Sequence, residues 1–265
     1  MAMTPPNRFK SALAEGRRLI GGWSMSGSAT IAEALGWSGA DFVVLDLEHS
    51  PTSTHAVLPL LQALDASGAI PVVRMASHDR IALKHALDLG ANTLYFPFVE
   101  TADAARGIVS AALYPPRGTR GFSRMNRASR YLAFEDYGPS AHDDLVLIPQ
   151  LESPQAIARA GEIASVEGVG AVFVGPGDLA VSLGLMGQIG HPRVRELMAE
   201  AAAAARAVGK ACGTVMGDPE SAAWAFSVGY QFVSVSNDMA AVASLSRAHQ
   251  SRTRELMANL PARVS

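Results

Sequence analysis

Short runs of apolar residues recur along the chain, and polar or turn-forming residues bound each run. The run Phe-Val-Val-Leu at 42–45 is one example. Continuous apolar runs of this length are typical of strands that are buried on both faces. The sequence predicts eight such strands, over residues 19–25, 42–45, 70–73, 93–99, 145–149, 171–174, 211–216 and 231–236.

Segments with helical periodicity separate the predicted strands. They cover residues 31–37, 54–66, 80–89, 102–113, 154–165, 193–208, 219–228 and 239–257. Eight alternations of strand and helix predict an α/β fold, a (β/α)8 TIM barrel that forms a single domain over residues 1–265. The active site of such a barrel is built at the carboxyl ends of its strands. Polar residues that directly follow a predicted strand are therefore the candidates for function.

Chemically capable side chains follow four of the predicted strands. Asp46, Glu48 and His49 come directly after the strand at 42–45. Two carboxylates and an imidazole so close together suit acid–base chemistry, or one side of a metal site. The other three strands are followed by Arg74, by Gln150 and Glu152, and by Asp178. From the residues alone, the last two carboxylates have structural alternatives, helix capping for the first and a turn for the second.

A long connection at residues 114–144 does not fit a minimal barrel. It lies between the fourth and fifth predicted strands and carries several arginines, namely Arg117, Arg120, Arg124, Arg127 and Arg130. Long connections in compact domains are usually functional or contain additional local structure. One interpretation is a solvated arginine-rich segment or a subunit contact. The other is a lid that attracts an anionic substrate, with Arg120 as the best candidate because nearby glycines let the backbone approach a ligand.

Composition and charge narrow the range of partners. Of the 265 residues, 49% are apolar and 17% are charged, which suits one domain with a large core. The formal net charge is −2 and there is no basic run, so we expect no nucleic acid and no membrane as partner, and favour a small-molecule substrate. Neither a membrane span nor a signal-peptide core is predicted. The lone Cys212 is expected to be a buried structural thiol, and the predicted location is cytoplasmic.

Five motifs of this chain resemble the HpcH/HpaI aldolase family, in their order and approximate spacing. They are Asp46-Leu-Glu-His49, Arg74, the segment from Tyr114 to Gly121, Gln150-x-Glu152 and Gly175-Pro-x-Asp178-Leu. The resemblance covers about residues 9 to 255. It implies a (β/α)8 barrel, a homo-oligomer (hexamer or trimer) with the last helix exchanged between subunits, and a metal-dependent class II aldolase. The implied reaction is reversible cleavage of 4-hydroxy-2-oxo acids to pyruvate and an aldehyde.

The resemblance also assigns catalytic roles. Glu152 and Asp178 correspond to the ligands of a divalent metal, and Mg²⁺, Mn²⁺ or Co²⁺ would suit two carboxylates. Arg74 corresponds to the residue that holds the 2-oxo oxygen of the substrate, and its alternative role is an internal salt bridge. His49 corresponds to the catalytic base, and Asp46 to the carboxylate that orients its imidazole. No catalytic role is assigned to Glu48.

Other matches concern the substrate pocket and the subunit contacts. Trp23 resembles a tryptophan that lines the pocket, although core packing is an equal alternative. Gln150 is expected to contact the substrate, or alternatively to bond only a backbone group. Gly177 and Val215, which stand where the family often has Ala and Leu, are also expected to contact the substrate. Asp88 matches an acidic residue that reaches a neighbouring subunit's active site. The alternative for Asp88 is a surface position in the last turn of its helix, and Arg120 is a second candidate for an inter-subunit contact.

The lysines distinguish two aldolase mechanisms. A Schiff-base aldolase needs a lysine near the carboxyl end of a strand, and the chain contains only Lys10, Lys84 and Lys210, none of which follows a predicted strand. We therefore expect a metal as electron sink, with no Schiff-base lysine and no organic cofactor. Two alternatives remain at this stage: an acyl-CoA lyase of the citrate-lyase β type, and a non-catalytic barrel that binds a small oxo acid.

Overall fold

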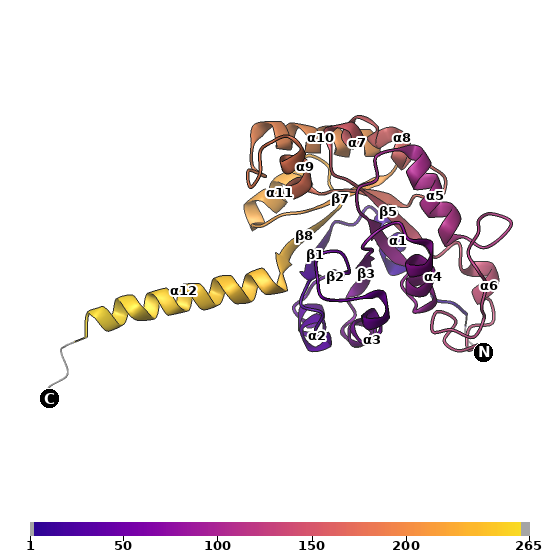
Figure 1. The fold of residues 1–265 in the computed structure, drawn as a ribbon, viewed down its shortest axis with the longest axis horizontal. Helices are drawn as coiled ribbons and strands as arrows, with labels where there is room; N and C mark the ends of the chain where they lie inside the picture. The colour runs from indigo at the N-terminus through magenta and orange to yellow at the C-terminus, as the bar shows by residue number, and fades with distance from the viewer. Residues whose placement is uncertain (1–2, 261–265) are drawn as a thin grey trace.

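Eight parallel strands form a closed barrel in the computed structural model, which describes residues 3–260 (Figure 1). Each strand pairs with its neighbours in chain order, and β8 pairs with β1 to close the barrel. The strands are β1 (Leu19–Ser24), β2 (Phe42–Asp46), β3 (Ile70–Arg74), β4 (Thr93–Phe96), β5 (Val146–Leu151), β6 (Ala171–Val174), β7 (Ala211–Val215) and β8 (Phe232–Asn237). The predicted (β/α)8 fold is confirmed.

Helices alternate with the strands, as the sequence predicts. They are α1 (Arg8–Ala14), α2 (Ala29–Trp37), the short 3₁₀ helix η1 (Thr54–Ala56), α3 (Val57–Ser67), α4 (Arg80–Asp88), α5 (Ala102–Ala112), α6 (Tyr137–Ser140), α7 (Pro154–Ala158), α8 (Ala160–Ala164), α9 (Pro176–Ser182), α10 (Pro192–Ala207), α11 (Pro219–Ser227) and α12 (Asp238–Ala258). Three of them, α1, α6 and α9, are not among the predicted helices. The strand predicted at 93–99 is shorter, because Pro97 follows its last residue and Phe98 adopts a left-handed backbone with φ of 52°.

Alternating residues of each strand form two apolar layers. Phe42 and Val44 face the inside of the barrel, whereas Val43 and Leu45 face the surrounding helices. This alternation follows from the two-residue period of a strand, and both faces are apolar because helices cover the outside. The inner layer is aromatic, and Tyr95 packs against Phe173 with ring centroids 4.7 Å apart.

Helix α1 closes the amino-terminal end of the barrel. Its Phe9 is fully buried and packs edge-on against Phe42 and Phe232, with centroid distances of 5.6 and 5.2 Å. Asn7 caps the helix by accepting hydrogen bonds from the backbone N–H groups of Phe9 and Lys10. The interior of the barrel is therefore plugged at its amino-terminal end.

The arginine-rich connection at 114–144 is packed only in part, because Arg120 and Arg127 are buried whereas its other arginines are exposed. Arg120 is only 3% exposed, and Arg127 bonds to Asp65 on α3 and to the carbonyl of Leu89 after α4. Within the connection, Tyr114 and Tyr137 form a small apolar cluster of their own. These contacts hold the segment against the outside of the barrel instead of leaving it as a free loop.

The last helix leaves the barrel. Figure 1 shows α12, in yellow, extending away from the strands, and Asp238 at its start is its one buried residue. Several apolar side chains along it are exposed, including Met239, Val242 and Leu245. Across residues 3–260, the structure contains no helix with the length and apolar character that a membrane crossing requires.

Glycine at position 213 makes room for an aromatic ring of the inner layer. A Cβ atom built there would lie 1.9 Å from the ring of Phe232. We expect Gly213→Ala to lower the free energy of unfolding by about 1–3 kcal/mol, because overpacking forces buried groups apart. Denaturant titration measures this value.

Gly107→Ala is the control, since nothing lies within 4 Å of a Cβ at that helical position and alanine favours a helix. Equal stability of Gly213→Ala and Gly107→Ala would show that the ring of Phe232 does not require a glycine here.

Candidate active site

A cavity of about 210 Å³ lies at the carboxyl ends of the strands. It brings together seven of the predicted site residues: Trp23, Arg74, Gln150, Glu152, Gly177, Asp178 and Val215. Five further lining residues are not predicted from the sequence: Met25, Phe173, Gly175, Pro176 and Asn237. The barrel thus gathers side chains from six strands or the loops that follow them, although those residues are far apart in sequence.

Glu152 is held by both of its carboxylate oxygens. Its Oε1 accepts a hydrogen bond from Gln150 Nε2 at 2.9 Å, and its Oε2 accepts one from the backbone N–H of Phe98 at 2.7 Å. Phe98 adopts the left-handed conformation to make this contact, which is strained for a residue with a side chain. Such strain at a site is typical where the surrounding structure holds a functional group in place.

The loop that carries Asp178 approaches Glu152 closely. A Cβ at Gly175 would lie 2.6 Å from Glu152 Oε1, so only glycine allows this spacing. Asp178 follows in the first turn of α9 and is half-buried. Burial and, to a smaller extent, the negative charges of Asp178 and Glu48 together raise the pKa of Glu152 to about 7, against an opposing hydrogen bond from the backbone of Phe98. Three carboxylates therefore share one small region.

Arg74 is fixed by ion pairs and by an aromatic ring. Its Nε and Nη2 donate to the two oxygens of Asp46 at 2.8 and 2.5 Å. Its Nη1 lies 3.0 Å from Glu48 Oε2, an ion pair without the alignment of a hydrogen bond. The guanidinium carbon also lies 4.7 Å from the ring centre of Trp23. The side chain is 9% exposed, so the guanidinium is rigid and largely shielded from water.

The structure gives Asp46 a different partner from the one that the resemblance implies. Asp46 binds Arg74 and accepts hydrogen bonds from the backbone N–H groups of Glu48 and His49. Within residues 3–260, no hydrogen bond joins Asp46 to the imidazole ring of His49. Burial tends to raise the pKa of Asp46, but the hydrogen bonds and charge of Arg74 outweigh it and leave the pKa below its ordinary value. The bidentate fork of the arginine explains this preference.

Glu48 is the carboxylate nearest to the imidazole. Its Oε1 lies 3.8 Å from His49 Nε2, and the His49 side chain is 57% exposed. Burial raises the pKa of Glu48, and the charge of Arg74 offsets part of that effect. Glu48 thus connects the base candidate His49 with Arg74, a position that the sequence does not predict for it.

The residues fit a hard divalent cation. In the part of the chain that the structure describes, no group of three or more His, Cys, Asp or Glu side chains is arranged to hold a metal ion. The donors that line the cavity are two carboxylates, Glu152 and Asp178. Such a pair suits Mg²⁺ or Mn²⁺, which keep several positions for water or substrate oxygens. The raised pKa of Glu152 fits as well, because a cation would relieve the repulsion between the clustered carboxylates.

Asp88 and Arg120 lie outside this cavity. Arg120 Nη2 donates to Asp88 Oδ1 at 2.7 Å and to the hydroxyl of Tyr137 at 3.2 Å, and its guanidinium stacks over Tyr114 at 4.5 Å. Arg120 therefore pairs within its own chain and does not line the candidate active site. An inter-subunit role for either residue stays a prediction.

Asn237 is a polar lining residue that the strand-end pattern can identify. It ends β8 and lines the cavity, and its side-chain oxygen caps α12 by accepting from the N–H of Ala240. The strand predicted at 231–236 ends directly before Asn237, so the rule that polar residues following a strand carry function applies to this residue as well. Met25, Phe173 and Pro176 are apolar, so no chemical signal marks them.

Comparison with known proteins identifies the class of protein. The sequence profile of the HpcH/HpaI aldolase/citrate lyase family matches residues 19–244. The chain belongs to this family. A solved family member from Burkholderia cenocepacia is 36% identical, with a TM-score of 0.89 over 94% of this chain and 99% of that one.

Two curated relatives carry more specific names. A 2-dehydro-3,6-dideoxy-6-sulfogluconate aldolase from Pseudomonas putida is 44% identical over 225 residues, which cover 85% of this chain and 88% of the relative. A hydroxypyruvate/pyruvate aldolase from Sagittula stellata is 40% identical over 245 residues, covering 92% and 97%. Carbon–carbon lyase activity of the aldolase type is the function that these relatives support.

The raised pKa of Glu152 makes a prediction for the metal-free protein. The folded state holds a proton up to about pH 7, whereas the unfolded carboxyl releases it near 4.5, so stability falls as pH rises across this window. Glu152→Gln removes the effect. We expect the variant to gain about 1–3 kcal/mol over wild type between pH 5 and pH 8.

Urea titrations of both metal-free proteins at the two pH values measure this difference. Glu162→Gln, an exposed carboxylate on α8, is the control. A constant difference between wild type and Glu152→Gln would show that Glu152 does not titrate in this window.

Proposed function

We propose that the protein is a divalent-metal-dependent class II pyruvate aldolase. It cleaves 4-hydroxy-2-oxo acids reversibly to pyruvate and an aldehyde. The observation that carries this proposal is a single cavity that holds Glu152, Asp178 and a fixed Arg74 but no lysine. Lys10 lies on α1, Lys84 on α4 and Lys210 directly before β7, all away from this cavity.

Glu152 and Asp178 would hold the metal, which we propose to be Mg²⁺, Mn²⁺ or Co²⁺. When bound, it polarises the carboxylate and keto oxygens of the substrate and so stabilises negative charge on them. Glu152 is prepared for this role because Gln150 and the backbone of Phe98 fix its two oxygens. Both carboxylates must be ionised to bind a cation, which favours neutral and higher pH.

Arg74 holds the oxygen on which charge develops. Two of its nitrogens are committed to Asp46, and Nη1 faces Glu48, which leaves further N–H groups for a substrate in the cavity. Asp46 positions the guanidinium instead of acting on His49. A donor fixed in this way needs no rearrangement as the enolate charge forms.

His49 removes the proton of the C4 hydroxyl group. The electrons of that O–H bond form the aldehyde carbonyl, the C3–C4 bond breaks, and its electron pair becomes the enolate of pyruvate. Glu48, 3.8 Å from the imidazole, then stabilises the protonated His49. In the reverse direction the same imidazolium returns the proton to the alcohol.

The pocket residues set the substrate range. Trp23, Gln150 and Val215 line the cavity together with Gly177, and we propose that they contact the substrate. Gly177 and Val215 are small and leave room around the aldehyde. The curated relatives are named for different substrates, a sulfogluconate derivative in one case and hydroxypyruvate or pyruvate in the other. We propose that the aldehyde partner of this protein depends on these pocket residues.

We also propose a homo-oligomer, a hexamer or trimer, in which α12 packs on a neighbouring subunit. The exposed apolar residues Met239, Val242 and Leu245 support this packing. Asp88 and Arg120 are the candidates for a further subunit contact. A cytoplasmic location fits the single, buried Cys212.

An acyl-CoA lyase is not favoured by the geometry. The phosphates of CoA need free basic groups beside the reacting centre. Among residues 3–260, the one basic residue that lines the cavity is Arg74, which is already paired with Asp46 and Glu48.

Two assays with opposite expected results test the mechanism. A chelator should abolish aldol cleavage, and Mg²⁺, Mn²⁺ or Co²⁺ should restore it. Pyruvate with borohydride should leave no reduced adduct on the intact protein by mass spectrometry, because no lysine reaches the cavity. A pyruvate adduct on a lysine, with activity that survives the chelator, would replace the metal mechanism by a Schiff base.

Arg74→Lys tests the role of the guanidinium. A lysine keeps the charge but loses the fork that binds Asp46, so we expect kcat to fall by roughly 100-fold, in line with about 3 kcal/mol for one lost oxyanion donor. Steady-state kinetics measure this, and near-ultraviolet circular dichroism checks the fold. Arg80→Lys, on the exposed start of α4, is the control. Turnover close to that of the control would leave Arg74 with a structural role alone.

His49→Ala separates proton removal from enolate formation. We expect aldol cleavage to fall by about 10²–10⁴, the usual contribution of a positioned base. Oxaloacetate decarboxylation should fall less, since it forms the same enolate without removing a hydroxyl proton. His55→Ala, an exposed histidine of η1, is the control. Equal losses in both reactions would argue against C4 deprotonation by His49.

A further inference from the structure

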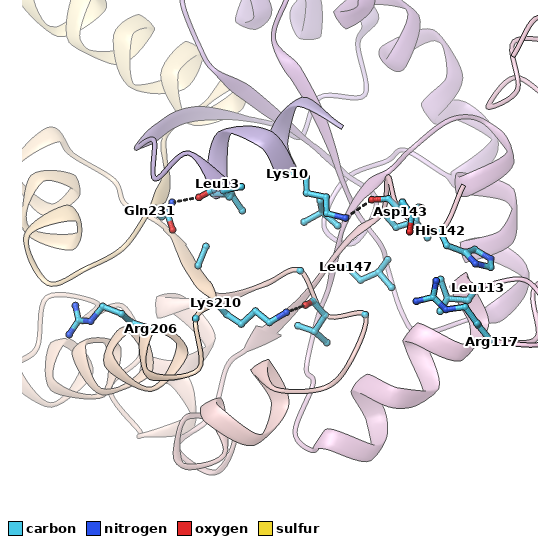
Figure 2. A pocket seen from close by; sticks show the side chains of 18 residues that line it. Lys10, Leu13, Leu113, Arg117, His142, Asp143, Leu147, Arg206, Lys210 and Gln231 are labelled. Carbon is cyan, nitrogen blue, oxygen red and sulfur yellow. Dashed lines mark hydrogen bonds between the residues drawn. The ribbon is translucent and has the colours of Figure 1, made fainter. Parts of the chain in front are cut away.

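A cavity with basic walls lies at the opposite end of the barrel. It measures about 520 Å³ and is bounded by α1, by the loops before β5, β6 and β7, and by residues of the 114–144 connection (Figure 2). Cavities of roughly 300–1,000 Å³ are the usual size for small-molecule sites. Its position at the amino-terminal strand ends separates it from the candidate active site. The six-residue strand β5 begins at this cavity and ends beside Glu152, a span of roughly 20 Å.

Positive charge dominates the walls of this cavity. Lys10, Arg117, Arg206 and Lys210 line it, against the single carboxylate of Asp143. The whole chain has a formal net charge of −2, so the walls of this cavity are more positive than the chain as a whole. Such an arrangement raises the local concentration of anions.

Two ammonium groups reach the cavity from different elements, without a carboxylate within ion-pair distance among the described residues. Figure 2 shows Lys10 reaching in from α1 and Lys210 from the loop before β7. Lys10 Nζ donates to the backbone carbonyl of Asp143, and Lys210 Nζ donates to that of Val169 at 2.6 Å. Among residues 3–260, no ion pair joins either lysine to a carboxylate within 4.0 Å. Each ammonium group therefore keeps two N–H donors for a ligand.

The surroundings of these two lysines favour an anion. Burial lowers the pKa of Lys210, and the charge of Lys10 lowers it further. An anion between the two ammonium groups would relieve both effects. His142 adds a neutral donor to the wall of the cavity. Burial lowers the pKa of its imidazole, and so do the charges of Arg117 and Arg120. Its Nε2 accepts a hydrogen bond from the backbone N–H of Tyr114 at 2.7 Å, so the proton of the neutral ring lies on Nδ1.

We propose that this cavity is a second ligand site, which binds the phosphate group of a small phosphorylated metabolite. The donors come from α1, the loop before β7 and the 114–144 connection, and so approach from several directions. A tetrahedral phosphate accepts hydrogen bonds from several directions, whereas a carboxylate accepts them mainly in one plane. The cavity also exceeds the volume of a phosphate ion alone, so it has room for the rest of a metabolite.

Calorimetric titration of the metal-free protein with pyrophosphate, at matched ionic strength, tests the proposal. Removal of the metal excludes binding through Glu152 and Asp178. We expect one saturable event per chain, with affinity reduced roughly tenfold or more in Lys10→Gln and in Lys210→Gln, because each loses a charge-assisted hydrogen bond. Lys84→Gln, the remaining lysine of the chain and half-buried like Lys210, is the matched control and should bind as wild type does.

Other outcomes of the titration would overturn the proposal. The first is the absence of saturable binding, and the second is unchanged affinity in both lysine variants. The third is tighter binding of citrate than of pyrophosphate, because the site would then not prefer phosphate.

A measurement on the wild-type chain covers the case in which a variant does not fold. Pyrophosphate should protect Lys10 and Lys210, but not Lys84, from reductive methylation, as read by peptide mass spectrometry. Equal modification of the three lysines with and without pyrophosphate would contradict binding in this cavity. Neither experiment depends on aldolase activity, so the result is independent of the proposed reaction.

Discussion

Closure of eight parallel strands into one barrel is the constraint on which the rest of this structure depends. Because all strands run the same way, their carboxyl ends meet at one rim, and residues as distant in sequence as Trp23 and Asn237 line one cavity. The aromatic inner layer and Phe9 of α1 fill the barrel beneath that cavity. The side chains at the rim therefore rest on a packed aromatic layer inside the barrel.

Within the rim, buried charge is balanced by pairing. Asp46 and Glu48 compensate Arg74, whereas no basic residue in the described part of the chain forms an ion pair with Glu152 or Asp178. A buried carboxylate without a cation takes up a proton or recruits a metal. The pKa of about 7 for Glu152 reflects this imbalance. The same electrostatics fix the arginine and create a site that suits a divalent cation.

The two ends of the barrel carry opposite electrostatics. Carboxylates cluster at the carboxyl ends of the strands, whereas Lys10, Lys210 and Arg117 line the cavity at the amino-terminal ends. Helix α1 has two roles at the amino-terminal end of the barrel. Its Phe9 plugs the interior, and its Lys10 lines the cavity. A short helix with only a weak sequence signal thus shapes an entire face of the molecule.

The sequence by itself determined the eight strands, most of the helices and the end of the barrel at which the candidate active site lies. Apolar runs and strand-end residues depend on local pattern, so that pattern alone assigns Arg74, Glu152 and Asp178 to one rim. The tertiary structure alone decided which side chains pair. It joined Asp46 to Arg74 instead of the His49 ring, joined Arg120 to Asp88, and turned Phe98 to hold Glu152. It also sent α12 away from the barrel. Each of these outcomes depends on the spatial distance between segments that are far apart in sequence, or on one strained backbone angle. Neither can be derived from the periodicity of apolar and polar residues along the chain.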